Sequence, residues 1–152
     1  LGTQDRPQIS PTMYRQFLKP GHARLFQMVR QKSDCAVFLH SCGSIAPLIP
    51  DLIEAGVEVL NPVQTSAAGM DPAKLKAEFG DQITFWGGGC DTQQVLPQAA
   101  PEEVAQHVKE RISILAPGGG FVFNQVHNIQ ADVPAENIIA MFDAARNFCF
   151  SN

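Results

Sequence analysis

The chain has 152 residues and a formal net charge of −4, with 45% hydrophobic and 17% charged residues. This length fits a single domain able to bury a core, so we expect residues 1–152 to form one domain with an irregular lead-in over residues 1–10. The negative charge, without any basic run, argues against a nucleic-acid groove and against a basic membrane anchor.

No apolar stretch approaches the length of a membrane span, and no leader pattern opens the sequence. Four cysteines are too few for a disulfide scaffold, so reduced thiols are expected. These features predict a cytoplasmic location and no membrane partner.

The first predicted elements are a helix, a strand and a second helix. Ser10 and Pro11 form an N-cap and proline pattern, and apolar residues at loosely helical spacing predict a helix over residues 12–31, interrupted near Pro20. An apolar run over residues 36–39 is too short for a helix and predicts a strand. The following helix, over residues 45–55, has an irregular start because it contains two prolines, and Gly56 ends it.

The later part of the chain continues the alternation of strands and helices. We expect strands over residues 57–63, 82–86 and 121–126, and helices between Asp71 and Gly80, over residues 101–115 and over residues 134–148. One helix followed by four strand–helix repeats predicts an α/β fold with a parallel sheet and right-handed crossovers.

Each predicted strand delivers polar or flexible residues at its carboxyl end. In barrels and open sheets of this class, the carboxyl ends of the strands line the active site. We therefore expect the following residues to gather at one rim: His40 and Cys42, Asn61 and Gln64, Gly87 to Asp91, and Asn124 with His127.

His40 and Cys42 form the most informative pair. Alternate residues of a strand point to the same face, so the two side chains should leave the strand side by side, while Gly43 allows a turn and Ser44 can cap the next helix. Imidazole and thiolate together suit zinc. The structural alternative is a buried histidine bonded to a carbonyl, beside an inert thiol. A catalytic zinc needs a third ligand, for which Cys90 and His127 are the candidates.

The remaining polar residues have weaker interpretations. Asp91 and Asp132 are candidate general acids, partners that orient a histidine, or helix caps; capping is favoured for Asp132 and a functional role for Asp91, because three glycines precede it. The glycine turns at 87–89 and 118–120 match no phosphate-binding fingerprint. No chemistry is assigned to His22, His107, Cys35 and Cys149. Trp86 is expected in the core or a pocket wall.

Four segments together resemble a known family. FLHSCGSI, IEAGVEVLNPVQ, GMDPAKLKAEFGDQITFWGGGCDTQ and LAPGGGFVFNQVHNIQADVPAENI resemble, in this order, the second half of the uroporphyrinogen decarboxylase superfamily. That superfamily joins a porphyrinogen-forming decarboxylase to corrinoid-linked methyltransferases on a (β/α)8 barrel. The resemblance implies the C-terminal half of a TIM barrel, completed by a second copy in a homodimer or by a missing N-terminal half.

The same resemblance suggests the methyltransferase branch. There, a His-x-Cys pair and a later cysteine hold the zinc that activates an acceptor thiol, and His40 and Cys42 match the pair. The later cysteine is expected in a glycine-rich turn, which here is residues 116–120 and has no thiol, so Cys90 or His127 would have to substitute. His127, with Asp132 and Glu136, also resembles the histidine segment that faces the pocket of the decarboxylases.

Three functions follow as hypotheses. The first is methyl transfer from a corrinoid on a partner protein to a thiol or similar acceptor, through zinc. The second is uroporphyrinogen decarboxylation, although the arginines and aspartate that the decarboxylases use lie in their first half. The third is a noncatalytic half-barrel. The expected site residues are His40, Cys42 and Cys90 as metal ligands, Asp91 and His127 as catalytic groups, and Asn61, Gln64, Gly88, Gly89 and Asn124 as substrate-binding residues.

Overall fold

The computed structural model describes residues 1–149 and contains one parallel sheet with the strand order β1-β2-β3-β4. This confirms the predicted α/β class. Within residues 1–149, no strand pairs with the outer edge of β1 or of β4, so the sheet is open, as in half of an eight-stranded barrel. The strands are β1 (Phe38–His40), β2 (Val59–Asn61), β3 (Thr84–Trp86) and β4 (Phe121–Val122).

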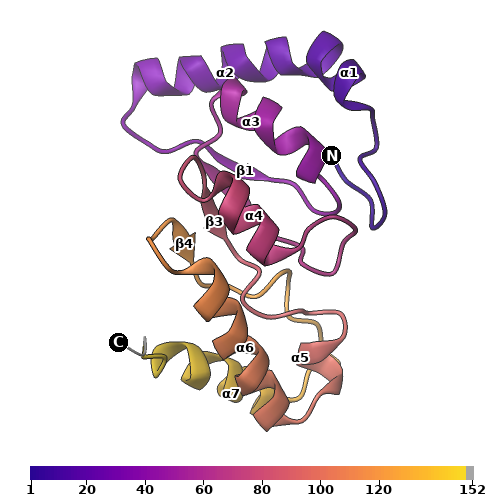
Figure 1. The fold of residues 1–152 in the computed structure, drawn as a ribbon, viewed down its shortest axis with the longest axis vertical. Helices are drawn as coiled ribbons and strands as arrows, with labels where there is room; N and C mark the ends of the chain where they lie inside the picture. The colour runs from indigo at the N-terminus through magenta and orange to yellow at the C-terminus, as the bar shows by residue number, and fades with distance from the viewer. Residues whose placement is uncertain (150–152) are drawn as a thin grey trace.

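The helices connect these parallel strands (Figure 1). Figure 1 shows α2 across one end of the molecule and α6 with α7 at the other, with α3, α4 and the sheet between them. None of the described helices is both long enough and apolar enough to cross a bilayer. The helical segments are α1 (Pro11–Met13), the π-helical turn η1 (Tyr14–Leu18), α2 (Lys19–Lys32), the 3₁₀ turn η2 (Ala46–Leu48), α3 (Ile49–Ala55), α4 (Pro72–Phe79), α5 (Val95–Gln98), α6 (Pro101–Leu115) and α7 (Ala135–Arg146).

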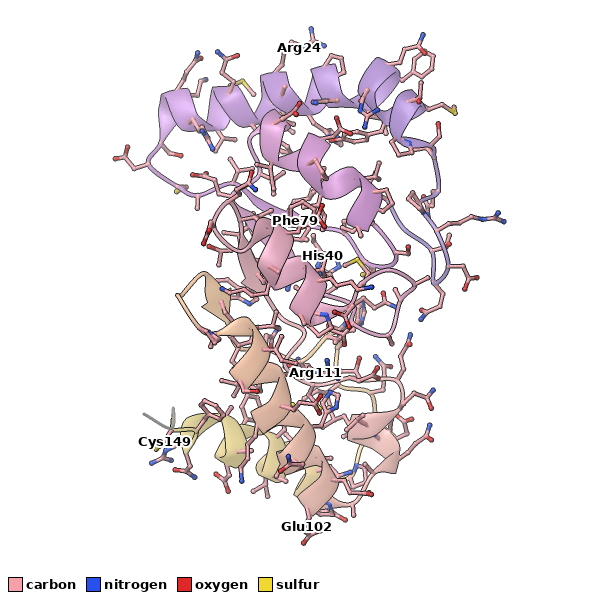
Figure 2. The ribbon with its side chains drawn as sticks, viewed as in Figure 1. Arg24, His40, Phe79, Glu102, Arg111 and Cys149 are labelled. Atoms are coloured by element: carbon pink, nitrogen blue, oxygen red, sulfur yellow. The ribbon has the colours of Figure 1, made fainter. Side chains whose placement is uncertain are left out.

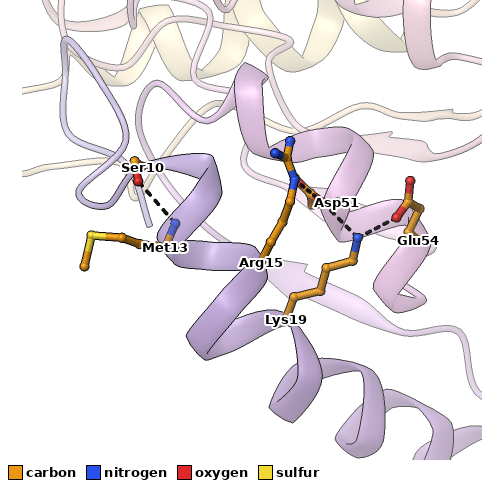
Figure 3. Close-up of polar contacts among 6 residues, drawn as sticks. All are labelled: Ser10, Met13, Arg15, Lys19, Asp51 and Glu54. Atoms are coloured by element: carbon orange, nitrogen blue, oxygen red, sulfur yellow. Dashed lines mark hydrogen bonds and ion pairs between the residues drawn. The ribbon is translucent and has the colours of Figure 1, made fainter.

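Helix caps form at most of the predicted positions. The Ser10 hydroxyl accepts a hydrogen bond from the backbone N–H of Met13 at 3.2 Å (Figure 3), and Asp71 caps α4 in the same way. Gly56 ends α3 in the left-handed conformation, with φ +109°. Ser44 does not cap the next helix as expected, because η2 begins after Ile45 without a side-chain cap.

The irregular part of the first helix lies earlier than predicted. The break was expected near Pro20, yet α2 runs through this residue, and the π-helical turn at Tyr14–Leu18 comes just before it. Proline has no N–H to donate and its ring collides with the preceding turn. A wider turn directly before Pro20 gives the ring room, so the helix continues.

A buried carboxylate joins the first helix to α3 (Figure 3). Asp51, with its side chain only 5% exposed, accepts hydrogen bonds from Arg15 and from Lys19, and Lys19 also pairs with the exposed Glu54. Burial by itself raises the pKa of Asp51, but the bonds from Lys19 and Arg15 outweigh it and leave the pKa below its ordinary value. The ion pairs therefore fix how α2 lies on α3.

The two faces of the sheet differ in burial. Leu60 and Phe85 point toward the helices and are fully buried in the main core, whereas a second core lies around α6 and α7. On the opposite face, the rings of Phe38 and Trp86 pack edge to face, with centroids 5.5 Å apart, and remain 48% and 39% exposed. Trp86 is therefore not part of the core.

Candidate metal centre

The carboxyl end of β1 holds the first two ligand candidates. His40, labelled in Figure 2, is the last residue of β1. Cys42 follows two positions later in the chain. The Sγ atom of Cys42 lies 3.3 Å from Nε2 of His40. The two side chains are thus adjacent, as the alternation of side chains along a strand predicts.

His127, in the loop between β4 and α7, completes a group of three. One ligand atom from each of His40, Cys42 and His127 lies within 4.8 Å of the other two. Among residues 1–149 this is the one group of three or more histidine, cysteine or acidic side chains that is spaced to hold a metal ion. His40 and His127 are exposed and Cys42 is partly buried, so an external ligand has access.

Asn61, at the end of β2, orients His40. The Oδ1 atom of Asn61 lies 2.7 Å from Nδ1 of His40, and its Nδ2 donates a hydrogen bond to the carbonyl oxygen of Trp86. Asn61 was expected to bind substrate, but its amide contacts protein groups at both ends. This contact to a possible metal ligand was not foreseen, although the parallel pairing of His40 with Asn61 gives rise to it.

Cys90 does not lie with His40, Cys42 and His127, so the expectation that it is a metal ligand is corrected. Its thiol is fully buried in the second core, and the sulfur contacts the carbonyl oxygen of Asp91. Burial, together with the nearby charge of Asp91, raises the pKa of the Cys90 thiol to about 12. Its enclosed position, away from the other candidate ligands, leaves this thiol without access to the group of His40, Cys42 and His127. His127 is the candidate that the structure supports.

Asp91 has a structural role that can be seen directly. Its Oδ1 atom accepts hydrogen bonds from the backbone N–H groups of Gln93 and Gln94, just before α5. Its own N–H donates to Nε2 of His107 at 3.4 Å. Burial, then the charge of Arg111, lowers the pKa of His107. His107, to which no role was assigned, thus keeps Asp91 in place, and one carboxylate oxygen is already used by the backbone.

The glycine turn after β3 packs closely against neighbouring parts of the chain. A Cβ atom on Gly89 would lie 2.4 Å from the ring of Phe123, and the N–H of Gly89 donates to the carbonyl oxygen of Asn124. Gly88 has a positive φ and lies against Val63. The side of Gly89 that a side chain would occupy is therefore filled by Phe123 and Asn124, and Asn124 contributes its backbone oxygen to the contact with the glycine turn.

The remaining predicted residues lie around the group. Gln64 accepts a hydrogen bond from the N–H of Gly43 and donates to Gln4, and so holds the loop that carries Cys42. With His127, Gln64 also lines a cavity of about 150 Å³. Asp132 makes no capping bond, because α7 begins after Pro134 without a side-chain cap.

The lead-in over residues 1–10 also supports this loop. The carbonyl oxygen of Thr3 accepts the N–H of Ser44, and the Gln4 side chain reaches both Gln64 and the backbone of Ser66. These residues were predicted only as irregular chain. No local pattern signals them, because their contacts are long-range.

The donor set fits zinc. Tetrahedral zinc with ordinary bond lengths places a sulfur and a nitrogen ligand about 3.6 Å apart, and two nitrogens about 3.3 Å apart. The Sγ atom of Cys42 and the Nε2 atom of His40 are 3.3 Å apart, which is close to the sulfur–nitrogen value. The ligand atoms of the other pairs lie at most 4.8 Å apart, so metal binding requires only a small inward movement of these side chains. Three protein ligands would leave a fourth position for an external ligand, as in catalytic rather than structural zinc sites.

Comparison with known proteins gives relatives of two kinds. The chain is 26% identical over 152 residues to uroporphyrinogen decarboxylase of Coxiella burnetii, covering 95% of this chain and 38% of that protein. It is 33% identical over 79 residues to the enzyme of Pseudoalteromonas atlantica, covering 52% of this chain and 21% of the relative. A methyltransferase from Methanosarcina mazei has the same fold, with a TM-score of 0.70 and 23% identity, over 91% of this chain and 37% of that one.

The chain spans less than two fifths of the length of these relatives. The model of the family described as uroporphyrinogen decarboxylase (URO-D) matches residues 5–148, nearly all of the chain. The chain therefore belongs to the uroporphyrinogen decarboxylase family.

Proposed function

We propose that this chain carries the metal-binding part of a site that transfers a methyl group from a corrinoid to a thiol or similar acceptor. The observation that supports it is the convergence of His40, Cys42 and His127 on one point. Two imidazoles and a thiolate form a ligand set typical of zinc.

In the proposed reaction, this chain supplies the side chains that would hold the metal. The sulfur of the acceptor forms a bond to the methyl carbon, the cobalt–carbon bond breaks with its electron pair left on cobalt, and the thiol proton is released. Bound zinc would lower the pKa of an acceptor thiol and so make it a nucleophile at neutral pH. His40, Cys42 and His127 hold their donor atoms together, while Asn61 and Gln64 support the end of β1 and the loop after it, which carry His40 and Cys42.

Metal content tests this proposal. Purified chain should bind about one zinc per molecule, measured by elemental analysis after removal of loose metal. Cys42→Ala should abolish stoichiometric binding. Cys35→Ala is the matched control, because this thiol is exposed and lies before β1, away from the group. No zinc in the wild-type chain, or equal loss in both variants, would refute the metal site.

Uroporphyrinogen decarboxylation is the second candidate, and the names of the relatives favour it. In this case His127, beside the small cavity with Gln64, would face the substrate without a metal. Release of carbon dioxide from uroporphyrinogen by zinc-free protein would favour this function. Transfer from methylcobalamin to a small thiol, followed by the absorbance of cobalamin, would favour the first.

The open sheet suggests a covering partner for either reaction. Phe38 and Trp86 leave a partly exposed apolar patch on the face away from the helices, and both sheet edges lack a partner within residues 1–149. We propose that a second copy or a complementary half-barrel covers this face. Sedimentation of the chain as a stable, compact monomer would count against the second copy.

A further inference from the structure

We propose that Asn61 is a positioning residue that fixes the tautomer of His40, so that Nε2 of the imidazole is the nitrogen available to the metal. The inference rests on the proposed zinc site for its function. The hydrogen bonds that carry it belong to the chain itself, so it can be tested without any metal.

The orientation of the Asn61 amide follows from its contact with Trp86. The Nδ2 atom lies 2.9 Å from the carbonyl oxygen of Trp86, which can only accept a hydrogen bond. The NH₂ end of the amide must therefore face this oxygen. A flipped amide would place two oxygens at this distance, so the contact leaves Oδ1 directed to the other side, toward His40.

The amide orientation then determines the protonation of the His40 ring. Oδ1 of Asn61 lies 2.7 Å from Nδ1 of His40, and an amide oxygen can only accept. Nδ1 must therefore carry the hydrogen, and in a neutral imidazole the lone pair then lies on Nε2. Nε2 is also the atom that lies 3.3 Å from Sγ of Cys42. The nitrogen freed for a metal thus faces the second ligand.

The sheet register explains why the two hydrogen bonds of the Asn61 amide are fixed. His40 is paired with Asn61 across β1 and β2, and Trp86 ends the next strand, β3. The two hydrogen bonds therefore join three neighbouring strands whose relative positions are set by backbone hydrogen bonds. Asn61 is only 9% exposed, so water competes little for either end of its amide. Hydrogen bonds of this kind orient metal-binding histidines in general.

The first test uses the unmodified, metal-free chain. Nitrogen-15 NMR of the histidine side chains at about pH 8, where an ordinary histidine is neutral, separates the two tautomers. Histidine side chains in water favour the tautomer with hydrogen on Nε2. We expect His40 to carry hydrogen on Nδ1 instead. An Nε2–H tautomer at His40 would overturn the inference, whether or not any variant folds.

Two substitutions of Asn61 distinguish loss of the hydrogen-bond acceptor from a general loss of order in the site. Asn61→Leu removes the acceptor, so His40 should change to the Nε2–H tautomer and zinc affinity should fall about 10- to 100-fold. Asn61→Asp keeps an oxygen acceptor beside Nδ1 and should retain the Nδ1–H tautomer, while its second oxygen faces the Trp86 carbonyl oxygen and should lower stability. Retention of that tautomer in Asn61→Leu would contradict the inference.

Gln64→Leu is the control, because Gln64 is the neighbouring amide that supports the Cys42 loop without touching His40. It should leave the tautomer of His40 unchanged. An equal change of tautomer in Asn61→Leu and Gln64→Leu would show loosening of the site and overturn the positioning role. An Nδ1–H tautomer in a wild-type chain that binds no zinc would instead retain the role of Asn61 and refute the proposed function.

Discussion

The imidazole rings of His40 and His127 lie edge to face, with centroids 6.2 Å apart and planes at 71°, although they come from opposite edges of the sheet. In a flat sheet, the first and fourth strands would be about 14 Å apart. Curvature of the sheet and the loop after β4 close this gap. The contact between the two histidines is therefore a consequence of barrel-like curvature, and it assembles the candidate metal-binding group.

The third ligand can be identified by comparing His127 with Cys90. We expect His127→Ala to weaken zinc binding at least about 100-fold, because loss of a ligand costs no less than loss of a residue that orients one. Cys90→Ala should leave the affinity unchanged, since its thiol is buried elsewhere. Competition with a chromophoric chelator measures both affinities. Weakened binding in Cys90→Ala with normal binding in His127→Ala would contradict this ligand set.

The thiols should differ sharply in reactivity. Because its pKa is raised to about 12 by burial and by Asp91, Cys90 has roughly one thiolate in 10⁴ molecules at pH 8, and its sulfur is enclosed. In native protein, iodoacetamide should modify the three cysteines that are not buried, Cys35, Cys42 and Cys149, and should leave Cys90 unmodified. Peptide mass spectrometry gives the extent at each site, with denatured protein as the control. Rapid labelling of native Cys90 would show that its surroundings are not those described.

Strand periodicity predicted the positions of His40 and Cys42 but could not predict that of Cys90. His40 and Cys42 follow directly from β1, so the alternation of side chains still applies. After β3, Gly87 and Gly88 have φ values of +106° and +80°, which turn the backbone out of the strand conformation. The direction of the Cys90 side chain therefore cannot be extrapolated from β3, and its thiol lies in the core.

The length of the fourth strand also could not be predicted from the local sequence. A strand was expected over residues 121–126, but β4 contains Phe121–Val122, followed by a single parallel bridge between Cys90 and Gln125. The apolar pattern indicates a strand correctly, whereas its length depends on how far β3 offers a partner. β3 ends at Trp86 because of the glycine turn. The short helix α5, after the Asp91 turn, was missed in the same way, since tertiary contacts and not periodicity define it.

The buried carboxylate Asp51 should contribute to stability more than its exposed neighbour Glu54. Both accept a hydrogen bond from Lys19, but their side chains are 5% and 70% exposed. We expect Asp51→Asn to lower the free energy of unfolding by about 1–3 kcal/mol at neutral pH, and Glu54→Gln by less than about 1 kcal/mol. Urea denaturation measures both values, and equal effects would show that burial does not matter here.

The contribution of Asp51 should also depend on pH. Its pKa in the folded state is lower than the ordinary 3.8, because the bonds from Lys19 and Arg15 outweigh the effect of burial. The stabilisation is therefore complete above the pKa of the unfolded state and is lost as pH falls through the lowered pKa of the folded state. The difference between wild type and Asp51→Asn should be constant near neutral pH and should shrink below about pH 3.8. A difference that grows in acid would contradict this sign.

Two glycine-to-alanine substitutions should change stability in opposite directions. Gly21 lies inside α2, and a Cβ atom there would have no neighbour within 4 Å, so Gly21→Ala should raise the free energy of unfolding by about 0.5–1 kcal/mol. A Cβ atom on Gly89 would lie 2.4 Å from the Phe123 ring and 2.9 Å from the Asn124 oxygen. Gly89→Ala should therefore lower the free energy of unfolding by about 1–3 kcal/mol.

The Gly89 substitution also tests how β3 and β4 hold the candidate metal-binding group. The clash forces the segment that contains Phe123 and Asn124 away from the glycine turn, and this segment leads directly to His127. Gly89→Ala should consequently weaken zinc binding as well, whereas Gly21→Ala should not. Urea denaturation and chelator competition on the same two variants check both expectations. Unchanged zinc affinity in a destabilised Gly89→Ala protein would show that His127 is held independently of the β3–β4 contact.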